Sequence, residues 1–199
     1  MPDAKRAVDL LLGVPALVVS LPVQAVVALV VRRRLGSPVL FRQERPGLHG
    51  RPFTMLKFRT MLEPDPARGL VTDDERMTRL GALLRSTSLD ELPALLNVVR
   101  GDMSLVGPRP LLVRYLDLYS PEQARRHDVR PGLTGLAQVD GRNTTTWERR
   151  LALDVQYVDT RTLRGDLRIM ARTVAAVLSR RGVSAEGTAT MPEFRGTGR

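Results

Sequence analysis

Residues 10–31 read LLLGVPALVVSLPVQAVVALVV and contain no charged side chain over 22 positions. About 20 apolar residues are enough for a helix to cross a bilayer, and this length also argues against a buried core helix. The apolar core of a signal peptide is shorter, roughly 7–15 residues, and leads to a cleavage site with small residues. Here Arg32, Arg33 and Arg34 follow instead. The stretch therefore predicts a membrane-embedded helix.

The flanks of this stretch indicate how its helix lies in the membrane. Basic residues stand on both sides of it, and basic residues favour the cytoplasmic side. A straight span would leave one basic cluster on the opposite side. Pro15 and Pro22 remove backbone hydrogen bonds and bend a helix, and the polar Ser20 and Gln24 lie nearby. We therefore expect a re-entrant helix within residues 1–36, with its kink at Ser20 and Pro22; a straight span is the alternative.

After residue 36 the sequence becomes that of a compact domain. Residues 39–43 and 52–60 predict the two strands of a short β-hairpin. Capping and periodicity predict helices at about 72–85, 90–99, 146–159 and 163–180, and a short helix that opens at Ser120. The glycines of residues 129–143 predict a structured loop. The predicted fold is α+β and mostly helical, with a compact domain over residues 37–186 and a flexible tail over residues 187–199.

The last of these helices is amphipathic and basic. An apolar stripe recurs at helical spacing among several arginines, and its members are Leu163, Leu167, Met170, Val174 and Val177. Such a helix can lie in a membrane interface. A surface helix that packs its apolar stripe on the core is the alternative.

Composition limits the chemistry. The net charge of +10 predicts a polyanionic partner, which is a nucleic acid, an anionic membrane surface or a phosphorylated substrate. One Trp, three Tyr and four Phe are few for stacking on bases, so a nucleic-acid-binding module is the weaker alternative. The absence of cysteine excludes disulfides and thiol catalysis. With two histidines, a metal would be held by carboxylates and phosphates, which favours Mg²⁺.

The stretch RSTSLDELP (85–93) carries the most informative acids. Pro93 is tolerated only near the start of a helix, which places Asp90 and Glu91 in a first turn. The positive end of the helix dipole there keeps a carboxylate ionised. Ser88 and Glu91 also have the spacing of a capping box, so a purely structural role is the alternative.

An ionised aspartate is a competent nucleophile for phosphorus. Attack of one anion on another requires cations that neutralise the gathering charge. Pro108 and Pro110 restrict the backbone on either side of Arg109 and could hold its side chain ready. The candidate phosphate-binding residues are Lys57, Arg59, Arg85, Arg109, Arg130 and Arg142.

Four motifs together resemble one family. They read FRQERPG (41–47), KFRTM (57–61), RSTSLDELPALLNVVRGDMSLVGPRPLL (85–112) and VRPGLTGLAQVDGRN (129–143). With these motifs, the chain resembles the monotopic phosphoglycosyl transferases, which are bacterial sugar transferases that begin glycan assembly on undecaprenyl phosphate. The resemblance extends from Lys5 to about Glu186, and it implies that residues 37–186 form the catalytic domain.

The resemblance implies a two-step reaction. Asp90 would attack the β-phosphate of a UDP-sugar, expel UMP and carry the sugar phosphate covalently. Undecaprenyl phosphate would then take it up, in the first membrane step of O-antigen, capsule, exopolysaccharide or glycoprotein assembly. The family requires Mg²⁺, which Asp90 and Glu91 would hold. By motif position, the cations that contact the phosphates would be Arg85, Arg109 and Arg142.

The resemblance also implies a place in the cell, the bacterial inner (cytoplasmic) membrane with the catalytic domain on the cytoplasmic face. The family breaks its re-entrant helix at a Ser-Pro pair, whereas this chain has Ser20-Leu21-Pro22. We expect a minimal catalytic version of the family, without the N-terminal transmembrane bundle of larger members. The motifs leave the transferred sugar and homo-oligomer formation open. An inactive membrane-anchored scaffold for glycan assembly is the alternative to an enzyme.

Overall fold

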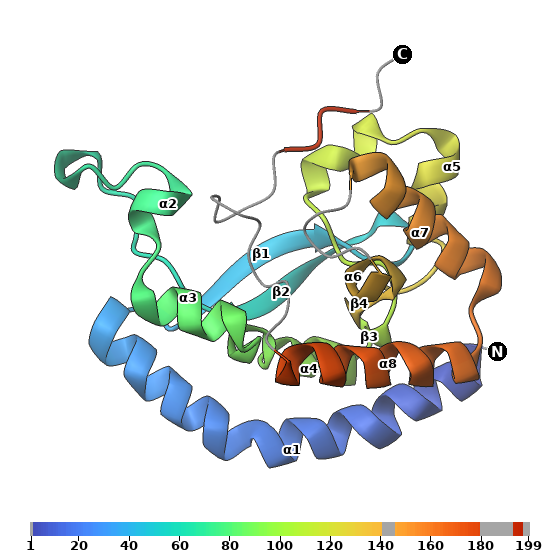
Figure 1. Cartoon of the computed structure of the whole chain (residues 1–199), viewed down its shortest axis with the longest axis horizontal. Coiled ribbons are helices and arrows are strands. Elements are labelled where there is room, and N and C mark those ends of the chain that lie inside the picture. The colour runs from blue at the N-terminus through green and yellow to red at the C-terminus, as the bar shows by residue number, and fades with distance from the viewer. Residues whose placement is uncertain (1, 141–145, 180–192, 197–199) are drawn as a thin grey trace.

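The computed structural model describes residues 2–140, 146–179 and 193–196 and confirms a mostly helical α+β fold (Figure 1). The strands are β1 (Leu40–Pro46), β2 (Pro52–Phe58), β3 (Ser104–Val106) and β4 (Gly132–Thr134). The α-helices are α1 (Pro2–Leu35), α2 (Asp73–Arg76), α3 (Arg79–Ser86), α4 (Ala94–Arg100), α5 (Pro121–Ala124), α6 (Leu136–Asp140), α7 (Trp147–Thr160) and α8 (Leu163–Leu178). The 3-10 turns are η1 (Leu48–Gly50), η2 (Pro66–Arg68), η3 (Leu89–Glu91), η4 (Val113–Leu118) and η5 (Arg125–His127).

Two small sheets organise the domain. β1 and β2 form the predicted antiparallel hairpin, in which Phe41 lies opposite Lys57. β3 and β4 form a parallel pair, and β4 lies in the region 129–143, where the sequence predicted only a structured loop. This pair is very close: a Cβ atom on Gly132 would stand 2.0 Å from the backbone nitrogen of Gly107. Glycine is therefore required at residue 132, and the loop after β3 is held tightly against β4.

Both ends of α1 pack against the domain formed by the residues that follow it. Near its start, Arg6 donates to the carbonyls of Val98 and Val99 at the end of α4, at 2.6 and 2.7 Å. Near its end, Val27 and Val31 are buried in a cluster with Phe58 and Leu84. The helix bends between these anchors and bows away from the domain in Figure 1.

The middle of α1 exposes apolar side chains. The helix is long and apolar enough to cross a membrane, and little of it is buried, unlike the core helix of a soluble protein. Its large exposed residues are Leu11, Leu12, Val14, Val18, Val19, Leu21, Val23, Val26, Leu29 and Val30. The polar side chains at its centre bind one another: Gln24 donates to Ser20 Oγ, and Ser20 donates to the Leu17 carbonyl, both at 2.9 Å.

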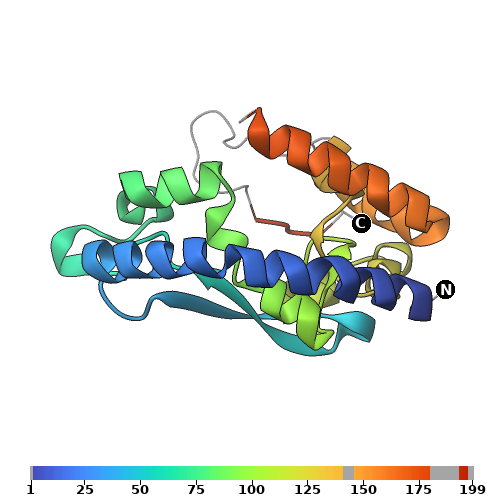
Figure 2. The ribbon, with the colours of Figure 1, turned by 90° about the horizontal axis from the view of Figure 1, so that it is seen from below.

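Two more helices expose apolar residues beside α1. Figure 2 shows α3 and α8 along one side of α1, and the β-hairpin along the other. On α8, Leu167 and Val174 are 54% and 59% exposed, whereas Ile169 is buried with Val106. Leu167 and Val174 of the predicted apolar stripe therefore do not face the core, whereas Met170 of the same stripe packs against it. Leu83 of α3 is similarly exposed.

Three sequence predictions need correction or completion. The helix predicted at 72–85 is two helices, α2 and α3, because Met77 is extended and forms a bridge with Met61. The helix predicted at 90–99 begins only at Ala94. Of the predicted tail, residues 193–196 are described, and Phe194 is buried among aromatic rings; the rest lies outside the described residues.

Candidate active site

The two adjacent acids Asp90 and Glu91, here called the dyad, lie on η3, the turn between α3 and α4. Ser88 begins this turn with a φ of 57°, and its side chain makes no capping hydrogen bond. The capping alternative is therefore wrong, since the Glu91 carboxylate binds cations instead. Pro93 is the N-cap residue of α4, so Asp90 and Glu91 precede this helix rather than forming its first turn.

Asn97 connects the dyad to the hairpin. Its side chain accepts a hydrogen bond from the Leu56 amide at 3.1 Å and donates to the Thr54 carbonyl at 2.8 Å. These are the free backbone groups at the open edge of β2, and Asn97 satisfies them as a neighbouring strand would. The contact locks α4 against β2 and thereby places η3 beside Lys57. Asn97 is not among the residues predicted from the sequence, although an asparagine within the apolar run ALLNVV is a signal for a buried polar contact.

Glu91 binds two cations. Lys57 Nζ lies 2.7 Å from Glu91 Oε1, and Arg109 Nη2 lies 2.5 Å from the same oxygen, with Arg109 Nη1 3.4 Å from Oε2. Burial alone would raise the pKa of Glu91, but the charges of Arg109 and Lys57 outweigh burial and hold this pKa well below its usual range. Glu91 is therefore ionised and holds both cations in place.

Asp90 has a different environment from its neighbour. It is 7% exposed, and within the described residues its carboxylate forms no ion pair or hydrogen bond. Burial, with the adjacent charge of Glu91, raises the pKa of Asp90 to about 6, while Lys57, Arg109 and Arg85 act in the opposite direction. The expected stabilisation of the ionised form by a helix terminus does not prevail, because desolvation is the larger effect. At neutral pH the group is still mostly ionised, and among the described residues neither of its oxygens has a partner.

A third cation reaches the dyad from α3. The Arg85 Nε atom donates to Thr60 Oγ1 at 3.1 Å, and its charge acts on Asp90. The helix approaches Thr60 so closely that a Cβ atom on Gly81 would stand 1.8 Å from the Thr60 carbonyl oxygen. Glycine at this position therefore allows α3 to present Arg85, one helical turn later, to the site.

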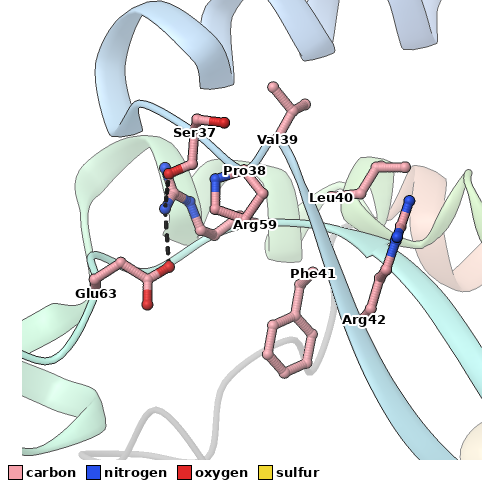
Figure 3. A pocket seen from close by; sticks show the side chains of 8 residues that line it. All are labelled: Ser37, Pro38, Val39, Leu40, Phe41, Arg42, Arg59 and Glu63. Carbon is pink, nitrogen blue, oxygen red and sulfur yellow. Dashed lines mark hydrogen bonds and ion pairs between the residues drawn. The ribbon is translucent and has the colours of Figure 1, made fainter.

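The other predicted cations lie elsewhere. Arg59 is buried and pairs with Glu63 at 2.9 Å. It also donates to the carbonyls of Leu35, the last residue of α1, and of Ser37 in the loop that follows. Figure 3 shows Arg59 directed toward this loop, beside a hollow of about 600 Å³. Arg130 donates to the Gly101 carbonyl at 2.9 Å. Neither arginine is among the charges with the largest effects on the pKa of Asp90, and Arg142 lies outside the described residues.

The dyad offers a limited set of metal ligands. In the part of the chain that the structure describes, no three His, Asp or Glu side chains gather into a metal site. Mg²⁺ usually takes one or two protein carboxylates and completes its shell with phosphate oxygens and water. Asp90 and Glu91 fit this pattern, with Asp90 the better ligand because both Glu91 oxygens already bind cations.

The sequence is similar to several known proteins. A family model described as bacterial sugar transferase matches residues 2–180. A protein of Bacillus subtilis (strain 168) named "Uncharacterized sugar transferase EpsL" is 53% identical over 170 residues, which cover 85% of this chain and 84% of the relative. The UDP-glucose:undecaprenyl-phosphate glucose-1-phosphate transferase of Caulobacter vibrioides is 46% identical over 187 residues, which cover 88% of this chain and 70% of the relative. The undecaprenyl-phosphate galactose phosphotransferase of Salmonella typhimurium is 37% identical over 196 residues, which cover 89% of this chain and 41% of the relative.

Proposed function

The chain belongs to the bacterial sugar transferase family, and we propose that it transfers a sugar 1-phosphate from a UDP-sugar to undecaprenyl phosphate through a covalent aspartyl phospho-sugar. The observation that carries this proposal is the contrast within the dyad. Glu91 forms ion pairs with Lys57 and Arg109, and this leaves the buried Asp90 carboxylate unpaired among the described residues. Two relatives are named as transferases that act on undecaprenyl phosphate.

In the first step, an Asp90 carboxylate oxygen attacks the β-phosphorus of the UDP-sugar. The bond between that phosphorus and the oxygen bridging to the α-phosphate breaks, and UMP leaves with the bridging oxygen. Negative charge gathers on the phosphoryl group, where Lys57, Arg85 and Arg109 stabilise it. Glu91 contributes by keeping two of these cations from pairing with Asp90. Mg²⁺ held by the dyad would supply further neutralisation of the diphosphate.

In the second step, a phosphate oxygen of undecaprenyl phosphate attacks the phosphorus of the aspartyl phospho-sugar. The bond from this phosphorus to the Asp90 oxygen breaks, which regenerates the carboxylate and gives undecaprenyl-diphospho-sugar and UMP overall. No proton has to be transferred when the attacking phosphate is ionised. The free, desolvated state of Asp90 suits both its attack and its departure.

The acceptor requires a site at the membrane, and α1 supports such a placement. Both of its ends pack on the domain, while its middle exposes apolar side chains. This arrangement favours a re-entrant helix over a straight span, because a straight span would separate the two ends by the membrane. The exposed Leu167 and Val174 of α8 and Leu83 of α3 favour an interfacial position for these helices. With basic residues at both ends of α1, the domain lies on the cytoplasmic face of the bacterial inner membrane.

The test is UMP release by the protein in nanodiscs with Mg²⁺, undecaprenyl phosphate and a panel of UDP-sugars. One sugar should give release that depends on the lipid. Asp90→Asn should abolish this release, whereas Asp117→Asn, which changes an exposed aspartate, should leave it unchanged. Without the acceptor, a donor labelled in its sugar should label the wild-type protein and not the Asp90→Asn variant.

Two results would contradict the proposal. Full activity of the Asp90→Asn variant would exclude the aspartyl intermediate. Failure of every UDP-sugar with folded, membrane-bound protein would favour the scaffold alternative, for which Asp90→Asn should have no effect on complex assembly.

A further inference from the structure

A fully buried ion pair joins η5 to α7. Arg126 and Asp154 are each 2% exposed, and Arg126 donates through Nε and Nη2 to Asp154 Oδ2, at 3.1 and 2.8 Å. Such a pair is weak evidence for a gain in stability, because the desolvation of two charges offsets much of their attraction. The pair therefore does more for the fold through the other contacts of Arg126 than through its own attraction.

Arg126 also holds the backbone of an active-site residue. The same Nη2 atom donates to the carbonyl of Arg109 at 2.6 Å. On the other side of that residue, the Arg109 guanidinium binds Glu91. The chain of contacts therefore runs from Asp154 through Arg126 and Arg109 to the dyad. The planar guanidinium of Arg126 donates to a carboxylate and a carbonyl at once, which a single ammonium group cannot reproduce with the same geometry.

The loop that carries Arg109 depends on such support. Pro108 and Pro110 have no amide hydrogen, so they cannot donate backbone hydrogen bonds. Gly107 donates to the Thr134 carbonyl and the Pro108 carbonyl accepts from Gly132, both at 2.9 Å, so the start of the loop is held by β4. Farther along, the carbonyls that follow accept from arginine side chains: Arg109 from Arg126, and Pro110 from Arg45 at 3.3 Å.

We propose that Arg126, oriented by Asp154, is a positioning residue for sugar-phosphate transfer, because it fixes the backbone from which Arg109 reaches Glu91 and the transferred phosphate. The inference rests on the proposed function for its chemistry, and its geometry is independent of the sugar. The buried pair acts through Arg109 and does not itself contact the reacting atoms.

The principal variant replaces both partners, Arg126→Met with Asp154→Leu. Removing both charges together leaves no unpaired charge in the core, so this variant should fold. The matched control is Arg125→Gln with Asp159→Asn, which removes an exposed ion pair between the same two elements. UMP release by the core variant should fall about 100-fold in kcat with little change in KM, because an arginine that acts in the transition state is displaced. The control variant should match wild type in both constants.

A combined variant separates positioning from general damage. If Arg126 acts through Arg109, the core replacement should cause no further loss in an Arg109→Ala background. A merely structural defect would lower kcat by the same factor in both backgrounds, and this result would overturn the proposal. Wild-type kcat in the core variant would overturn it as well. If the core variant does not fold, Arg126→Lys is measured in the same two backgrounds, with the same expected results.

Hydrogen exchange of residues 107–112 provides a readout that does not depend on activity. The amides of Gly107, Arg109, Leu111 and Leu112 should exchange faster in the core variant, or in Arg126→Lys if that variant is used, than in wild type and in the control. Unchanged exchange there would overturn the proposal. If the wild-type protein is inactive while the core variant shows the expected faster exchange, this result would count against the proposed function and support the positioning of Arg109.

Discussion

Two buried regions, the η5–α7 contact and the η3 turn, handle carboxylates in opposite ways. At η5–α7, Asp154 pairs with Arg126, and both side chains are buried. At η3 two cations bind Glu91, and within the described residues none pairs with Asp90. The carboxylate of Asp154 is therefore paired where Arg126 holds the backbone of Arg109. Among the described residues, the carboxylate of Asp90 stays unpaired although cations lie near it. An unpaired buried carboxylate of this kind is typical of a group kept for chemistry.

The largest difference in stability between the regions should come from removing the carboxylate of each set of ion pairs, Asp154 with Arg126 and Glu91 with Lys57 and Arg109. Asp154→Asn leaves Arg126 buried without its counter-charge and should lower the free energy of unfolding by about 3–5 kcal/mol. Glu91→Gln should cost less, about 1–2 kcal/mol, because the Lys57 and Arg109 side chains are 20% and 35% exposed and water can solvate them. Denaturant unfolding of both variants measures this order. Equal losses of unfolding free energy in the two variants would mean that burial does not decide how much these ion pairs contribute to stability.

Acidification should destabilise the η5–α7 region through His127, which lies in η5. Burial and the charge of Arg126 lower the pKa of His127 to about 4, so His127 is neutral in the folded protein. The unfolded chain takes up this proton near its ordinary value of about 6.5. The contribution of His127 to stability is therefore complete above pH 6.5 and is lost as the pH falls to about 4. Between pH 6.5 and about 4, the His127→Phe variant should lose about 2–3 kcal/mol less unfolding free energy than wild type.

Unfolding measured from pH 7 to pH 4 tests the effect of His127. The control is His49→Phe, since His49 lies exposed in the hairpin turn. This control should retain the pH dependence of wild type. A wild-type slope in His127→Phe would show that other groups cause the acid sensitivity.

The elements that the sequence predicts well are those whose signals are local. The apolar run of α1 and the two strand segments on either side of the turn from Gly47 to Gly50 each lie within one short window. The adjacent acids of the dyad were recognisable for the same reason. Helix propensity failed at Met77, where a bridge to Met61 outweighs the local preference.

The sequence could not predict which arginines lie near the dyad and which bind other parts of the fold. Arg59 and Arg85 both lie in quoted motifs, yet Arg59 is taken up by Glu63 and the carbonyls after α1, while Arg85 acts on the dyad. The contact from Arg126 to the Arg109 carbonyl spans 17 residues, and the pair with Asp154 spans 28. Which partner an arginine finds depends on tertiary packing, and no spacing rule covers such distances.

The smallest predicted effect has the opposite sign to the first two and concerns Asp90. Because burial raises its pKa to about 6, the ionised form destabilises the fold at neutral pH, and Asp90→Asn should increase the free energy of unfolding by about 1–2 kcal/mol. The gain should be full above pH 6 and should vanish toward pH 4, where the wild-type group takes up a proton in the folded protein. Unfolding of the Mg²⁺-free protein measures this gain, with Asp117→Asn as the exposed control. A loss of stability in Asp90→Asn at pH 7 would show that the Asp90 charge is satisfied after all, and the contrast between the η3 turn and the η5–α7 contact would fail.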